Sequence, residues 1–124
     1  MMSKPFRLLA YLTLPAMLAS CATVPSKQDV DRKLGTLVIP VIEFKGAEPQ
    51  AVLAFMTTES RKVDPQKQGV QFVLAPSSVP YRRIEPFRLV NIPLRELTKF
   101  VSYVSGCKFR IEGGKVVFSH VDEP

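Results

Sequence analysis

Apolar residues recur at helical spacing in two stretches of the chain. In residues 93–106 they form one stripe, Pro93 suits the start of a helix, and Gly106 suits its end. In residues 49–63 a second stripe follows a proline that suits a first helical turn. The stripes consist of Leu94, Leu97, Phe100, Val101 and Val104 in one stretch and Val52, Leu53, Met56 and Val63 in the other. Both stretches are predicted to be helices that pack on a core.

Alternating apolar and polar residues predict five strands. In the first, Ile42 and Phe44 share a face, and Pro40 indicates a sheet edge or a break. Near the end of the chain Gly113 and Gly114 predict the tight turn of a hairpin. The predicted strands are residues 36–44, 70–74 and 87–90 and the two arms of this hairpin. The order is therefore β-α-β-β-α-β-β, which predicts a small α+β domain with one core.

The first twenty residues have the three-part plan of a secretory signal peptide. A basic start is followed by the apolar stretch "LLAYLTLPAMLA" of 12 residues and then by small residues. Crossing a bilayer as a helix takes about 20 apolar residues, and Pro15 interrupts this stretch, so a permanent membrane span is disfavoured. Residues 1–20 are therefore predicted to be removed.

The segment Leu18-Ala19-Ser20-Cys21 resembles the lipobox of bacterial lipoproteins. The resemblance implies that the Cys21 thiol receives a diacylglyceryl group, that the chain is cut before it, and that the attached acyl chains hold the protein on a membrane. An ordinary signal peptide with an incidental cysteine is the alternative. Ala22, rather than aspartate, follows the cysteine, which favours the outer membrane facing the periplasm. Residues 21–35 are polar and are predicted to be a flexible tether.

With Cys21 lipidated, Cys107 has no partner for an intramolecular disulfide. It lies between an apolar helix and an alternating strand, where a small buried thiol commonly fills a core, so we expect it to pack there. The composition, 46% hydrophobic and 23% charged, is that of a globular protein.

The net charge of +6 is spread along the chain. Lys4 and Arg7 precede Cys21, which leaves 15 basic and 11 acidic residues in the remainder. Because these basic residues are scattered rather than clustered among aromatic residues, we expect no nucleic-acid binding. Weak attraction to an anionic membrane surface stays open.

Two segments, "IEFKGAEPQAVLAFM" and "RLVNIPLRELTKFVSYVSGCKFRIEGGKVVF", together with the turn "RKVDPQKQGVQFVL", resemble the secretin and TonB short amino-terminal domain. The resemblance covers about residues 38–119, and residues 36–121 are assigned to this domain, with 122–124 as a tail. It implies two helices packed against two small sheets and a domain that acts by protein–protein contact, where relatives dock the periplasmic ends of secretins or receptors onto partners.

Groups that carry catalysis are scarce. His120 is the only histidine and lies near the end of the chain, where a solvated role is expected. No spacing of His and Cys predicts a metal site, and no glycine-rich loop predicts a phosphate site. We therefore expect no enzyme, no cofactor beyond the lipid on Cys21, no metal and no small-molecule substrate.

Residues 75–86 are predicted to be a loop, because they include three prolines and two serines. Basic and aromatic side chains in this loop, and basic side chains on the exposed face of the second helix, are candidates for contact with a partner. They are Tyr81, Arg82, Arg83, Arg95 and Lys99.

Two sheet edges are further candidates: the strand with Pro40 and the last strand, near Val121. The expected function is that of an anchored docking domain in the cell envelope, which meets a secretin or a TonB-type transport or secretion system. A structural envelope lipoprotein without such a partner is the alternative.

Overall fold

The computed structural model describes residues 24–121. The predicted signal peptide, the predicted lipidation site Cys21 and the predicted tail 122–124 lie outside these residues. The elements in chain order are α2 (Lys27–Thr36), β1 (Val38–Phe44), α3 (Pro49–Val63), β2 (Phe72–Leu74), β3 (Phe87–Pro93), α4 (Leu94–Ser105), β4 (Cys107–Glu112) and β5 (Lys115–His120). In the described range no helix has the length and apolar character needed to cross a membrane.

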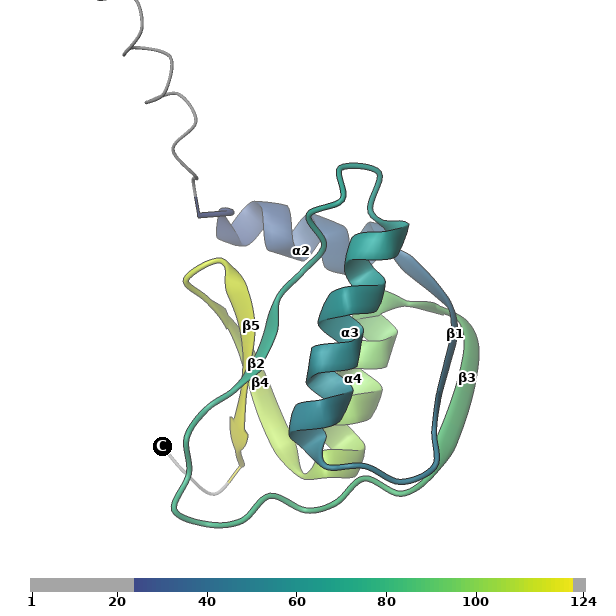
Figure 1. Cartoon of the computed structure of the whole chain (residues 1–124). Coiled ribbons are helices and arrows are strands. Elements are labelled where there is room, and N and C mark those ends of the chain that lie inside the picture. The colour runs from purple at the N-terminus through teal and green to yellow at the C-terminus, as the bar shows by residue number, and fades with distance from the viewer. Residues whose placement is uncertain (1–23, 122–124) are drawn as a thin grey trace, which may run out of the picture.

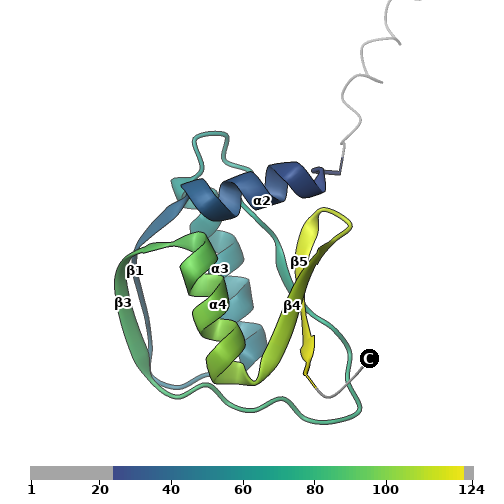
Figure 2. The same cartoon turned by 180° about the vertical axis from the view of Figure 1, so that it is seen from behind.

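Helices α3 and α4 lie side by side between two small sheets (Figures 1 and 2). One sheet pairs β1 with β3, antiparallel, and the other has the strand order β2-β5-β4. The predicted α+β class and the order β-α-β-β-α-β-β are confirmed, with α2 added in front. The core draws on side chains from Val30 to Phe118, so the chain from residue 24 onward holds every core residue described.

The predicted second helix is α4, whose buried face includes Leu94, Leu97 and Val101. It ends where Gly106 adopts the left-handed conformation, with φ at 70°. Cys107 follows and is 3% exposed in the core, which confirms its predicted packing role. Local spacing and a glycine stop signal were sufficient to predict this helix.

The prediction of a flexible tether over residues 21–35 is wrong where the structure describes it, because residues from Lys27 form helix α2. Ser26 caps this helix by accepting a hydrogen bond from the backbone N–H of Asp29 (3.0 Å). Val30 and Leu34, four residues apart, are buried in the core. The folded domain therefore begins at α2 rather than at residue 36, and the first strand begins at Val38.

A buried ion pair fastens α2 to the loop after α3. Lys33 Nζ donates to Asp64 Oδ2 (2.9 Å) and to Gln68 Oε1 (3.2 Å). Burial raises the pKa of Asp64, but hydrogen bonds from Lys33 and from the backbone N–H groups of Gln66 and Gly69 outweigh it and hold this pKa well below its usual range. The carboxylate is therefore charged at neutral pH.

The last strand is not an edge strand, which corrects that prediction. β5 is the centre of its sheet, parallel to β2 and antiparallel to β4. Four consecutive residues, Val116 to Ser119, are buried, so side chains on both faces of β5 are shielded from solvent. The edges of this sheet are β2 and β4.

Candidate functional site

Two of the predicted contact residues are engaged within the domain. Arg95 Nη1 lies 3.1 Å from Asp31 Oδ1, and its Nη2 donates to the Asp31 carbonyl oxygen (2.8 Å). Arg83 Nη1 lies 3.2 Å from Glu48 Oε2, and its Nη2 donates to the Gly46 carbonyl oxygen (3.2 Å). Arg95 thus joins α4 to α2, and Arg83 joins the loop before β3 to the turn before α3.

The structure does not bring the predicted contact residues together. Arg82 lies against Gly106 at the end of α4, whereas Arg95 lies near its start, about 16 Å away along a helix of this length. Lys99 is exposed and pairs loosely with Glu96 (3.7 Å). Arg82 and Arg83 line a shallow hollow with the exposed Tyr103. The five residues therefore form separate groups rather than one contact surface.

Tyr81 holds its loop against the three-stranded sheet. Its hydroxyl donates to the carbonyl oxygen of Ala75 (2.6 Å), and its ring stacks on His120 with centroids 4.5 Å apart. His120 Nε2 lies 3.1 Å from the carbonyl oxygen of Pro80. His120 is partly exposed, and these contacts give its ring a structural role.

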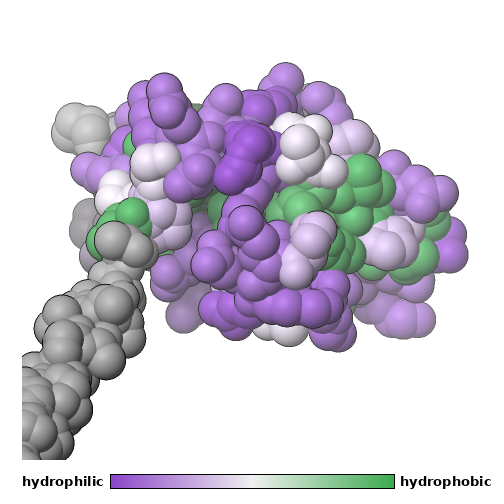
Figure 3. Space-filling model, turned by 90° about the horizontal axis from the view of Figure 1, so that it is seen from above, coloured by the Kyte–Doolittle hydropathy of each residue, from purple (hydrophilic) through white to green (hydrophobic). Residues whose placement is uncertain are grey.

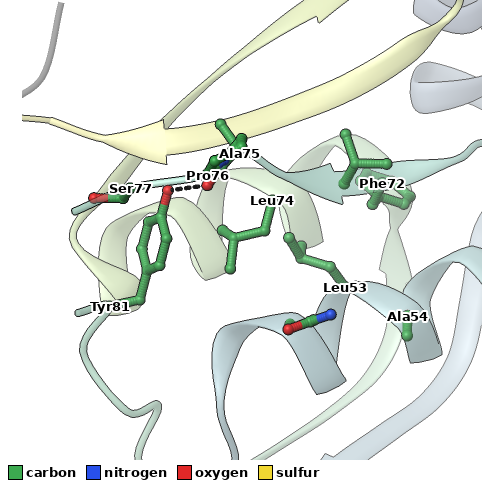
Figure 4. Close-up of a pocket in the computed structure, with 10 residues that line it drawn as sticks. Leu53, Ala54, Phe72, Leu74, Ala75, Pro76, Ser77 and Tyr81 are labelled. Atoms are coloured by element: carbon green, nitrogen blue, oxygen red, sulfur yellow. Dashed lines mark hydrogen bonds between the residues drawn. The ribbon is translucent and has the colours of Figure 1, made fainter. Parts of the chain in front are cut away.

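A groove of about 490 Å³ runs between α3 and the edge strand β2 (Figure 4). Its lining is largely apolar, with Leu53 and Ala54 from α3 and Leu74 from β2. Tyr81 stands at one end, where its hydroxyl bonds the backbone beside Pro76. The sequence pattern did not reveal this groove, because its walls come from segments about twenty residues apart in the chain.

The backbone edge of β2 turns toward this groove. Side-chain hydroxyls of α3 satisfy its first part: Ser60 Oγ accepts from the N–H of Val70 (2.8 Å), and Thr57 Oγ1 accepts from the N–H of Phe72 (2.9 Å). In a parallel ladder, alternate residues direct both backbone groups to the same side, so Leu74 directs its N–H and C=O away from β5 as Phe72 does. No hydroxyl of α3 reaches Leu74 among the described hydrogen bonds. The edge is open there.

Both strands of the two-stranded sheet are edge strands, as Pro40 suggested, but the outer edge of each strand is interrupted. The pairing of β1 with β3 skips Pro40 and Asn91, and the alternation of the strand breaks there, since Ile39 and Ile42 are both buried although they are three residues apart. Pro40 supplies no N–H to a further strand. In β3, Asn91 has φ at 48°, and Pro93 also lacks an N–H.

The outer face of this sheet is apolar. Val38, Val41 and Val90 are 45%, 46% and 49% exposed, and Val41 pairs directly with Val90. Figure 3 shows a group of apolar side chains at the centre and right of its view. This sheet therefore presents an apolar surface rather than a regular hydrogen-bonding edge.

Within residues 24–121, no group of three His, Cys, Asp or Glu side chains is placed to hold a metal ion. Comparison of the chain with models of protein families, with curated proteins and with solved structures finds no match.

Proposed function

We propose that this protein is a lipid-anchored envelope protein whose domain docks a partner protein, and that an extended segment of the partner lies in the groove beside β2. The observation that carries the proposal is the open backbone edge at Leu74, directed into a groove with apolar walls. An extended peptide in that position adds one strand to the sheet, and its alternate side chains contact the apolar walls.

The resemblance to the secretin and TonB short amino-terminal domain supports this reading. Two helices between a two-stranded and a three-stranded sheet are the arrangement expected from it. A secretin, or a component of a TonB-type transport or secretion system, is the proposed partner. The resemblance of Leu18–Cys21 to a lipobox supports a lipid anchor, and Ala22 after it supports the outer membrane, facing the periplasm.

Two alanines on α3 provide a matched test of the groove. Ala54 and Ala51 are both exposed, but only Ala54 lines the groove. A photo-crosslinking amino acid at each position, in intact cells, is expected to join one discrete partner at position 54 and not at position 51. Mass spectrometry then identifies the partner.

Binding of the purified partner gives the decisive comparison. Ala54→Glu is expected to abolish it by placing a charge against an apolar surface, and Ala51→Glu is expected to leave it unchanged. Equal effects of the two substitutions, or no crosslink at position 54, contradict docking through the groove. The absence of any partner in cells favours the alternative of a structural envelope lipoprotein.

The anchor has its own test, in cells fed a labelled fatty acid. The protein is expected to take up the label, and Cys21→Ala is expected to abolish the labelling and release the protein from the membrane. Labelling that persists in Cys21→Ala contradicts lipidation at this residue.

A further inference from the structure

The path from the proposed anchor to the folded domain is short. Val24, three residues after Cys21, is the first residue described. Because an extended chain spans at most about 3.6 Å per residue, Val24 lies within about 11 Å of a lipidated Cys21. The helix α2 begins only three residues later, at Lys27. A flexible tether of fifteen residues would have left the domain free to turn. The short segment between Cys21 and Lys27 instead keeps one end of the domain beside the bilayer.

That end of the domain is defined by tight packing. A Cβ atom placed on Gly114 would lie 2.6 Å from Val24 Cγ1 and 2.9 Å from the carbonyl oxygen of Pro25. The turn between β4 and β5 is therefore packed directly against the segment that leads to Cys21. In Figure 1 the start of α2 lies near this turn, at the end opposite to the loop over residues 75–86.

A hollow of about 550 Å³ opens at the same end, between α2, the loop after α3 and the turn between β4 and β5. Arg61, Lys67 and Lys115 line it, and none of them takes part in an ion pair among residues 24–121. Figure 3, which looks onto this end, shows hydrophilic side chains over much of it.

The other charged residues of the hollow are already neutralised. Asp29 pairs with Arg32 (3.1 Å), and Lys33 pairs with the buried Asp64 (2.9 Å). The lining therefore has three uncompensated positive charges and no uncompensated carboxylate. Cationic side chains bind phosphate oxygens through charge-assisted hydrogen bonds.

We propose that this end of the domain binds the phosphate groups of anionic phospholipids in the bilayer that holds the anchor. The proposal rests on the proposed lipidation for its setting. Contacts of Arg61, Lys67 and Lys115 with lipid phosphates fix the domain upright, with the loop over residues 75–86 and the Tyr81 end of the groove turned away from the membrane. The partner then approaches from the side of the periplasm.

The test uses the chain from residue 22 onward without lipid, since it holds every core residue described. Its binding is measured by co-sedimentation with vesicles of phosphatidylcholine alone and with vesicles of equal parts phosphatidylcholine and phosphatidylglycerol. Binding is expected to the anionic vesicles only. Each cation removed near the surface weakens binding about fivefold, so Lys67→Glu combined with Lys115→Glu is expected to weaken it at least about 25-fold.

The matched control is Lys45→Glu combined with Lys99→Glu, which changes the net charge equally at two residues that do not line the hollow. It is expected to bind anionic vesicles nearly as well as the unchanged chain. Thermal unfolding, expected to be similar in both double variants, verifies that each one is folded.

Equal loss of binding in the two double variants, or no binding to anionic vesicles, overturns the proposal. Displacement of the chain by soluble glycerol phosphate also overturns it, since that result indicates a site for a free phosphate compound. The chain used in the vesicle experiment has no lipid and no partner. A negative result with vesicles therefore says nothing about the proposed function, which the fatty-acid labelling and the Ala54 comparison test separately.

Discussion

Replacement of Lys33 by methionine tests whether α2 is an integral part of the domain. The side chains of Lys33 and Asp64 are 9% and 3% exposed, and Lys33 Nζ lies 2.9 Å from the carboxylate. Breaking a buried pair by removing one partner typically costs 3–5 kcal/mol, because the remaining charge stays buried without a counter-charge. Backbone N–H groups of Gln66, Gln68 and Gly69 still bond Asp64, so the lower end of that range, about 3 kcal/mol, is expected.

Urea unfolding followed by circular dichroism measures this loss. About 3 kcal/mol corresponds to a Tm lowered by roughly 12–24 °C in a domain of this size. The control is Arg32→Met, in the same helix, because Arg32 and Asp29 form an exposed pair and such pairs are worth at most about 1 kcal/mol.

The combined variant Lys33→Met with Asp64→Asn completes a double-mutant cycle, and it is expected to be more stable than Lys33→Met alone, because no charge is then left without a partner. Equal stability of Lys33→Met and Arg32→Met would refute the reasoning, since it would mean that α2 contributes no buried pair to the fold.

Three further predictions concern acid, backbone crowding and thiol reactivity. Folding lowers the pKa of Asp64, so its charged form contributes stability above the unfolded-state pKa of about 3.9. That stability is lost as the pH falls through the pKa of the folded state. Between about pH 5 and pH 2, Asp64→Asn is therefore expected to lose less stability in urea unfolding than the unchanged protein. Gly69 and Gly113 both have positive φ, but only at Gly69 would a Cβ atom be crowded, since it would lie 2.6 Å from Ser60 Oγ. Replacement by alanine is expected to lower the stability measured by thermal unfolding by about 1 kcal/mol at Gly113 and by about 2–4 kcal/mol at Gly69. Equal losses at the two positions would contradict the crowding. Cys107 is 3% exposed, so in the chain from residue 22 onward it is expected to react with a thiol reagent only after denaturant is added, and rapid reaction without denaturant would place it outside the core.

Local patterns determined most of the secondary structure. Spacing predicted α3 over residues 49–63 and α4 close to its observed bounds, because an apolar stripe with a proline at the start and a glycine at the end is visible within one segment. The hairpin turn at Gly113 and Gly114 was visible for the same reason. These elements were sufficient to predict the α+β fold class.

Helix α2 shows where local pattern was insufficient. Its ten residues include five charged ones, so the segment reads as a polar linker, and the cap at Ser26 with Val30 and Leu34 is a weak signal. What stabilises it comes from elsewhere in the chain, above all Asp64, which lies 31 residues after Lys33. The sequence provides both side chains without indicating that they meet.

The ion pairs of the candidate contact residues were hidden from the sequence for a related reason. Arg83 and Arg95 look like exposed cations in the sequence, but a carboxylate distant in the chain engages each of them. The groove beside β2 was invisible because it depends on which strands pair.

The sequence by itself determined helices α3 and α4, the hairpin turn, the α+β class and the composition of the amino-terminal segment, since these depend on neighbouring residues. Only the tertiary structure decided that β5 is central, that β2 keeps an open edge at Leu74, and that the domain begins with α2 at Lys27. Strand order, ion pairing and the shape of a groove depend on contacts between distant segments, and these form only when the chain is folded around its core.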